Sequence, residues 1–122
     1  RAAQESIAYQ VNDLLTAMKR DTGVALSSLS VDGGASRDSF LMQFQADISN
    51  CTIRRPVIRE TTALGACYLT GLATGVWSSR DELKELWRCD TLYAPSMEDE
   101  KRSRLLNGWD KAVGRSLDWA EH

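Results

Sequence analysis

Two adjacent glycines, Gly33 and Gly34, form the part of the sequence best suited to hold a ligand. They follow an alternating apolar segment that ends at Val31 and precede a segment with helical periodicity. Glycine adopts positive φ without a steric penalty and lets a ligand approach bare backbone. The N–H groups at the start of the following helix suit an anionic group or a polar ring edge. A nucleotide is therefore the candidate ligand, and a tight turn without a ligand is the structural alternative.

The carboxylates of the sequence give weaker evidence of a functional site than the glycine pair. Asp32 has the chemistry of a metal ligand or a general base, but no second carboxylate stands at a matching strand end, so we interpret it as a turn former. Asp47, Asp13 and Glu5 fall on the polar faces of helical segments, and we expect them to face solvent. These residues predict neither a catalytic pair nor a metal site.

Histidine and cysteine are too few for several kinds of chemistry. The single histidine, His122, is the last residue, so Ser-His-Asp triads, Cys-His pairs and His-containing metal clusters lack a needed member. Cys51, Cys67 and Cys89 contain no C-x-x-C pair, and their odd number argues against a disulfide framework. We expect Cys67, within an apolar run, to be a small buried hydrophobe. A reducing, cytoplasmic location fits this cysteine usage best.

The charge balance excludes two classes of partner. A formal net charge of -2 on 122 residues leaves no basic field for a nucleic-acid backbone or an anionic membrane. One segment carries three basic side chains, those of Arg54, Arg55 and Arg59. They could form a binding patch, but we favour the interpretation that they lie on a solvated strand edge. No segment approaches the roughly 20 apolar residues of a membrane span. We expect no nucleic-acid partner and no membrane partner.

Helical periodicity begins with the first residues. Polar residues lie opposite a stripe of apolar residues at helical spacing, namely Ile7, Ala8, Val11, Leu14, Leu15 and Met18. No capping residue precedes this pattern, which ends before Gly23. We therefore expect the numbering to start inside a helix.

Short strands and a second helix must position the glycine pair. Alternation predicts a strand over Leu26–Val31, and Ser36 or Asp38 is suited to cap the helix that follows the glycines. Thr52–Pro56 is rich in β-branched residues and predicts a strand that ends near Pro56, because proline donates no ladder hydrogen bond.

Three helices are expected in the second half of the chain. Small side chains mark one from Thr61 or Thr62 through Thr74, and Ser79 with Glu82 forms a capping box for the next. We interpret Thr91–Pro95 as a link between two helices and Ser96–Asp99 as the start of the last helix. Its apolar stripe comprises Leu105, Leu106, Trp109, Ala112, Val113, Ser116, Leu117 and Ala120.

Tryptophans offer one further function. Trp77, Trp87, Trp109 and Trp119 are possible stacking platforms for bases or sugars. Trp109 lies on the apolar stripe of the last helix and Trp77 ends an apolar segment, so we assign both to core packing. The order of elements predicts a helix-dominated α/β fold with about five helices and a few strands.

Several stretches of the sequence, in order along the chain, form a pattern known from one enzyme family. They are Glu5–Gln10, Ser30–Ala35, Phe40–Ile48, Glu60–Gly75 and Gly108–Val113. The chain resembles the C-terminal part of the glycerol kinases, in the sugar-kinase branch of the actin-like ATPases. Related xylulose and gluconate kinases share the glycine turn and the Ala-Leu-Gly-Ala segment, whereas the Met-Gln-Phe-Gln-Ala-Asp segment and the Trp109 segment favour the glycerol enzymes.

The resemblance implies a fold and a reaction. The fold would be the helix-rich part of an actin-like (ribonuclease H-like) ATPase domain, with residues 1–122 as a partial C-terminal nucleotide-binding domain. The reaction would be transfer of the ATP γ-phosphoryl group to glycerol, giving glycerol 3-phosphate, with magnesium on the phosphates of ATP and ADP. Gly33 and Gly34 match the adenosine motif of the family. Asp38 stands where an asparagine usually contacts the nucleotide.

Asp38 departs from the family pattern in a way that affects binding. A carboxylate accepts hydrogen bonds but cannot donate them as an amide does, and it adds negative charge near a polyanion. We therefore expect either weaker nucleotide binding or a helix cap at Asp38. The family's catalytic aspartate, glycerol-binding residues and phosphate-gripping loops have no match among these residues.

The resemblance therefore implies that this chain is part of an enzyme and does not catalyse alone. Glycerol would be bound by a preceding part of a longer protein, which we expect to be a homo-oligomer. Two alternatives stay open. One is a non-catalytic interaction or regulatory module with the same fold, and the other is a kinase of another polyol or sugar, such as xylulose or gluconate.

Overall fold

A computed structural model describes residues 1–117. His122, Trp119 and Ala120, to which the sequence analysis refers, lie outside the described residues. The elements, in chain order, are α1 (Ala2–Thr22), β1 (Ser28–Ser30), a 3-10 turn (Gly34–Arg37), α2 (Ser39–Ser49), β2 (Thr52–Pro56), α3 (Thr61–Ala73), α4 (Arg80–Leu86), β3 (Cys89–Tyr93) and α5 (Asp99–Ser116). This confirms the helix-rich α/β prediction.

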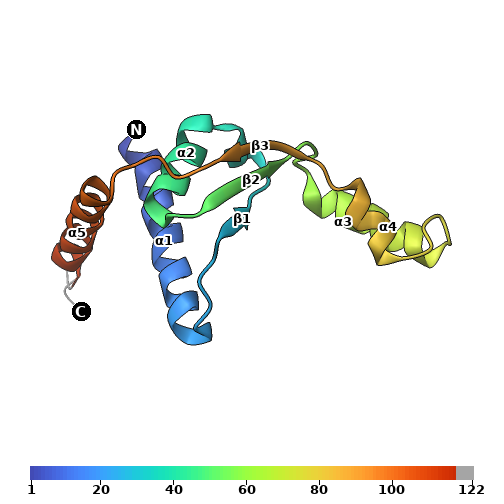
Figure 1. Ribbon diagram of the computed structural model, residues 1–122, viewed down its shortest axis with the longest axis horizontal. Coiled ribbons are helices and arrows are strands. Elements are labelled where there is room, and N and C mark those ends of the chain that lie inside the picture. The colour runs from blue at the N-terminus through green and yellow to red at the C-terminus, as the bar shows by residue number, and fades with distance from the viewer. Residues whose placement is uncertain (118–122) are drawn as a thin grey trace.

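The sheet is small and mixed. Its strand order is β1-β2-β3; β1 runs parallel to β2, and β3 runs antiparallel to β2. Figure 1 shows α1 and α2 side by side next to the sheet, with α5 beyond α1 at one end and with α3 and α4 at the opposite end. No helix within residues 1–117 is both long and apolar enough to cross a bilayer.

The core lies between α1, α2 and the sheet. Its buried hydrophobic residues are Ala8, Tyr9, Leu41, Met42, Phe44, Ala46, Ile48, Cys51, Ile53 and Tyr93. Tyr9 meets Phe44 edge to face at 5.5 Å between ring centroids, and it stacks on Trp109 of α5 at 5.2 Å. The predicted core role of Trp109 is confirmed, and its indole N–H also donates to Asp13 Oδ2 at 2.7 Å.

One predicted strand is confirmed with shorter bounds, and one predicted link was wrong. The strand expected over Leu26–Val31 is regular at Ser28–Ser30, where it pairs with β2. Residues Thr91–Pro95, expected to form a link, belong largely to β3, which pairs with β2 through residues such as Tyr93 opposite Ile53. Strand pairing between segments about 35 residues apart leaves no local periodic signal in β3.

Arg54 and Arg55 do not form a solvated strand edge, because they belong to β2, the central strand. Arg55 donates to Asp90 Oδ2 at 2.9 Å and to Thr91 Oγ1 at 2.8 Å on β3. Arg54 lies over the ring of Trp87, 4.5 Å from its centroid. The hydrogen bond from Arg55, and next that from Thr91, lowers the pKa of the Asp90 carboxyl. Arg55 therefore links β2 to β3, and Arg54 links β2 to the residue that follows α4.

Asp47 was expected to face solvent and is instead buried, 8% exposed. Its Oδ1 accepts hydrogen bonds from the segment that precedes α5, where Ser96 was expected to cap that helix. The backbone N–H groups of Ser96 and Met97 donate to it at 2.7 and 3.1 Å. The N-cap of α5 is Glu98, which makes no side-chain capping bond.

Candidate functional site

Gly33 holds the glycine turn in a conformation that favours glycine. Its φ is +75°, in the region where side chains with a Cβ are strained. The Gly33 N–H donates to the Arg59 carbonyl at 2.9 Å, just before α3. The Gly33 carbonyl accepts from the hydroxyl of Ser36 at 2.7 Å, and Ser36 is buried. These two hydrogen bonds therefore link the glycine turn to the segment after β2 and to the 3-10 turn that follows.

Gly34 supplies the bare backbone that the sequence predicted, but not a second positive φ. It is the exposed first residue of the 3-10 turn, and a Cβ built on it would meet no atom within 4 Å. Nothing in the surrounding fold therefore requires glycine at this position. The space above Gly34 is open to a ligand.

Asp38 caps α2. Its Oδ1 accepts from the N–H groups of Phe40 and Leu41 at 2.9 and 3.1 Å. Its Oδ2 accepts from the amide of Gln4 on α1. Asp38 thus satisfies N–H groups at the start of α2 that would otherwise be free for an anion, and it joins the N-terminal ends of the two helices.

The capping role of Asp38 predicts different losses of stability for two substitutions. We expect Asp38→Ala to lower the free energy of unfolding by about 1 kcal/mol, because the first N–H groups of α2 lose their acceptor. Asp38→Asn should cost close to nothing, since asparagine caps helices equally well. Urea unfolding followed by tryptophan fluorescence measures both, and equal losses in the two variants would contradict a capping role.

An apolar hollow of about 300 Å³ adjoins the turn. It is lined by Asp32 and Ala35 of the turn and by Ile7, Leu29 and Leu41. Asp32 is exposed. No cluster of three or more His, Cys, Asp or Glu side chains in the described part of the chain is placed to hold a metal ion.

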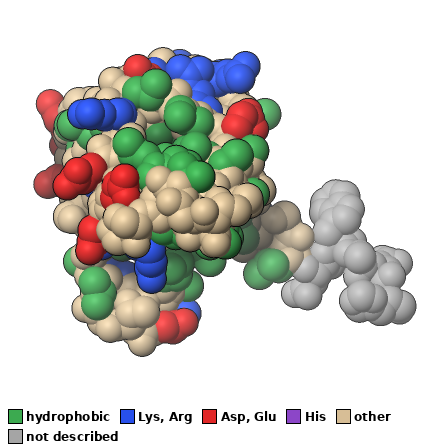
Figure 2. Space-filling view, turned by 90° about the vertical axis from the view of Figure 1, so that its right-hand side faces the viewer, with side chains coloured by type: hydrophobic (Ala, Val, Ile, Leu, Met, Phe, Trp, Pro, Cys, Tyr) green, Lys and Arg blue, Asp and Glu red, His purple; other side chains and the backbone are tan. Residues whose placement is uncertain are grey.

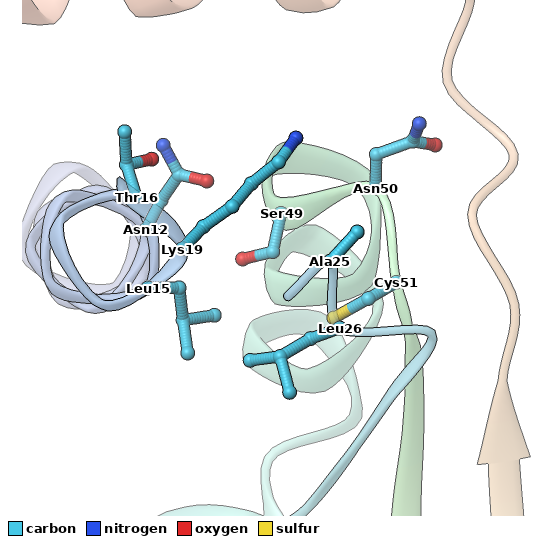
Figure 3. Close-up of a pocket in the computed structure, with 9 residues that line it drawn as sticks. All are labelled: Asn12, Leu15, Thr16, Lys19, Ala25, Leu26, Ser49, Asn50 and Cys51. Atoms are coloured by element: carbon cyan, nitrogen blue, oxygen red, sulfur yellow. The ribbon is translucent and has the colours of Figure 1, made fainter. Parts of the chain in front are cut away.

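A second hollow, of about 270 Å³, lies at the other end of α2 (Figure 3). Asn12, Thr16 and Lys19 of α1 line one wall, and Ser49 and Asn50 at the end of α2 line another. The sequence did not reveal it, because its residues come from separate segments that meet only in the folded chain. It does not include the glycine turn.

Known proteins match both the sequence and this geometry. The C-terminal domain model of the FGGY family of carbohydrate kinases matches residues 1–74. A glycerol kinase of Clostridium botulinum is 60% identical over 121 residues, which are 99% of this chain and 24% of that protein. The chain thus spans about a quarter of the length of this relative.

Solved structures of related kinases resemble this chain in fold. The crystal structure of Plasmodium falciparum glycerol kinase with ADP superimposes with a TM-score of 0.86 at 38% identity, over 98% of this chain and 24% of that one. A ligand-bound xylulose kinase from Lactobacillus acidophilus superimposes with a TM-score of 0.75 at 22% identity, over 95% of this chain and 24% of that one, which shows the fold alone. The expected actin-like kinase fold is confirmed. Sequence and fold together establish that this chain belongs to the FGGY family of carbohydrate kinases, as part of its C-terminal domain.

Proposed function

We propose that this chain is the adenosine-binding, C-terminal part of a longer glycerol kinase. The longer protein would transfer the γ-phosphoryl group of ATP to a glycerol hydroxyl, so that ADP leaves and glycerol 3-phosphate forms. The observation that carries the proposal is the open backbone at Gly34, in a chain that is 60% identical to a glycerol kinase and superimposes on a glycerol kinase solved with ADP.

Each residue of the turn has a distinct role in this proposal. Gly33, with its positive φ and its bond to Arg59, holds the turn in place. Gly34 lies against the nucleotide through its backbone. Asp38 positions the N-terminal end of α2 beside the nucleotide, and its negative charge weakens binding of the polyanion.

Magnesium and the reacting groups belong to the rest of the protein in this proposal. The described residues include no carboxylate cluster fit for a metal ion, so the phosphates and the preceding part of the protein would hold magnesium. When bound, magnesium neutralises charge that develops on the phosphates. Phosphoryl transfer depends mainly on positioning, and this chain would contribute to it by orienting the adenosine.

Gly34→Val tests the site without disturbing the turn. Because the space above Gly34 is open, valine fits the fold but occupies the approach of the nucleotide. We expect the longer protein to lose affinity for ATP with magnesium by about 10-fold or more, which is about 1.4 kcal/mol. Calorimetric titration measures the affinity. The same substitution at Gly108 on α5, where space is also open, is the matched control, and unchanged affinity in Gly34→Val would contradict the site.

Two assays separate the remaining functions. A phosphotransfer assay of the longer protein on glycerol, xylulose and gluconate identifies the substrate, and preference for xylulose or gluconate would overturn the glycerol proposal. Absence of both phosphotransfer and ATP binding in the longer protein would favour a non-catalytic module instead. Assembly as a homo-oligomer, a cytoplasmic location and the expected lack of nucleic-acid and membrane partners stay predictions.

A further inference from the structure

The guanidinium of Arg55 lies between β3 and the glycine turn. Its side chain is only 11% exposed, and arginine is rarely buried to this extent unless it is paired. Nη1 donates to the Ser36 carbonyl in the 3-10 turn at 3.3 Å. Nε donates to Asp90 Oδ2 at 3.0 Å, and Nη2 lies 2.9 Å from the same oxygen. One side chain of β2 therefore joins the 3-10 turn to β3.

The planar shape of the guanidinium makes these contacts depend on one another. Its N–H groups lie in one plane at fixed angles, so the contacts of Nε and Nη2 with Asp90 determine where Nη1 points. Nη2 also donates to Thr91 Oγ1 at 2.8 Å, and the guanidinium carbon lies 5.4 Å from the centroid of the Tyr93 ring. All three partners belong to β3. The strand β3 therefore holds Arg55 in the orientation that reaches the Ser36 carbonyl.

A second contact holds the other side of the turn. The Gly33 N–H donates to the Arg59 carbonyl at 2.9 Å, and Nη2 of Arg59 lies 3.7 Å from Asp90 Oδ2. Ser36 is also bound to Gly33, because its N–H and its hydroxyl both donate to the Gly33 carbonyl, at 3.3 and 2.7 Å. Gly34 lies between Gly33 and Ser36 in the chain. Both arginines that hold the exposed backbone of Gly34 in place thus contact the same carboxylate.

Attraction of phosphates by a basic surface is a different role for such arginines, and the charges do not favour it. Figure 2 looks onto the end of the molecule that carries α3 and α4 and shows Lys and Arg side chains interspersed with Asp and Glu. The charge of Arg55 is paired with that of Asp90. What Arg55 can contribute to a ligand at the turn is therefore its hydrogen bond to the Ser36 carbonyl.

We propose that Arg55, oriented by Asp90, is a positioning residue for the nucleotide. It holds the Ser36 carbonyl, so that the backbone at Gly34 has its binding conformation before the nucleotide arrives. This inference rests on the proposed function, because it concerns the nucleotide site at Gly34. A loop that is ordered in advance binds more tightly, since binding does not have to order it. Arg55 contacts neither nucleotide nor glycerol in this proposal and acts through the turn.

Arg55→Lys tests this role, because it removes the planar arrangement of donors but keeps the positive charge beside Asp90. In the longer protein we expect the KM for ATP to rise about 10-fold, whereas kcat and the KM for glycerol change by less than about 2-fold. A merely structural role would lower the fraction of folded enzyme, and hence kcat, without changing either KM. Steady-state kinetics with ATP and glycerol measure all three quantities.

The same substitution at the neighbouring residue is the matched control. The side chain of Arg54 lies over the ring of Trp87, and neighbouring side chains of a strand point to opposite faces of the sheet. Arg54→Lys should therefore leave the KM for ATP unchanged.

Asp90→Asn is a milder variant that tests the same contact if Arg55→Lys folds poorly. Asparagine keeps an oxygen acceptor for Arg55 but loses the charge, so we expect the KM for ATP to rise by about 3-fold. An unchanged KM for ATP in both Arg55→Lys and Asp90→Asn would overturn the proposal.

Combination with Gly34→Val tests whether Arg55 acts through the turn. Substitutions that affect one contact are not additive, so Arg55→Lys should weaken ATP binding much less in the Gly34→Val background than in the unsubstituted protein. Calorimetric titration of the longer protein with ATP and magnesium measures the four affinities. An equal loss of affinity in both backgrounds would overturn the proposal.

The positioning role and the proposed function fail in different ways. Weaker binding in Gly34→Val with unchanged binding in Arg55→Lys would overturn only the positioning role. Unchanged binding in both variants would overturn the nucleotide site as well. Hydrogen exchange without nucleotide gives a readout that does not depend on the ligand. We expect the N–H groups of Gly33 and Ser36 to exchange about 10-fold faster in Arg55→Lys, and unchanged rates would overturn the proposal.

Discussion

Asp47→Ala is expected to lower the free energy of unfolding by about 3 kcal/mol, because several donors would lose their acceptor in a buried site. Asp47 Oδ1 accepts from the N–H groups of Ser96 and Met97 and from the hydroxyl of Ser96, at 2.7, 3.1 and 3.2 Å. The amide of Gln43 also donates to it, at 3.1 Å. The variant leaves these partly buried donors without this acceptor or forces the segment before α5 to move.

Urea unfolding followed by tryptophan fluorescence measures this loss, since Trp109 of α5 packs on Tyr9. Asp47→Asn keeps an oxygen acceptor but loses the charge, so it should cost about 1 kcal/mol. Asp110→Ala, at an exposed position of α5, is the matched control and should change stability by less than about 0.5 kcal/mol. A loss in Asp47→Ala no larger than that of Asp110→Ala would show that the segment before α5 is held in another way.

Gly71→Ala should destabilise the protein by about 2 kcal/mol, because the added methyl group would overpack α3 against Trp77. A Cβ at Gly71 would overlap the six-membered ring of Trp77. That ring is rigid and meets Tyr68 edge to face at 5.3 Å, so it cannot move aside without losing this contact. Glycine is therefore required here by close approach, not by its backbone conformation.

Gly65→Ala, on the same helix, should change stability in the opposite direction. A Cβ at Gly65 meets no atom within 4 Å, so alanine should stabilise the protein by up to about 1 kcal/mol through its higher helix propensity. Thermal and urea unfolding of the two variants compare the signs directly. Stabilisation by both substitutions would mean that Trp77 does not pack on α3.

Local patterns predicted most of the helices and part of the candidate site. Gly23, with φ of +70°, ends α1 as expected, and β2 ends at Pro56 as expected. The positive φ of Gly33 and the cap at Asp38 were also visible in the sequence. Each of these features depends on residues within about four positions of one another, so its physical cause is contained in a short segment.

Features that join distant segments could not be predicted. The strand β3, the ion pair between Arg55 and Asp90, and the burial of Asp47 each require two segments about 35 to 50 positions apart to meet. The sequence also predicted a buried Cys67, which is exposed in the described residues. The apolar character of α3 was evident in the sequence, but the sequence does not show which residues pack against it.

The sequence by itself determined the order of helices, the glycine turn and, through its ordered motifs, the kinase family. The order of helices and the glycine turn rest on periodicity, capping and the freedom of glycine, which act within one segment, whereas the family rests on the resemblance of the motifs to those of known kinases. Only the tertiary structure decided that the space above Gly34 is open whereas Trp77 closes the space at Gly71, and that Asp47 holds the segment before α5. The physical reason is that packing and burial depend on which distant atoms occupy the same space, and a one-dimensional pattern does not contain that information.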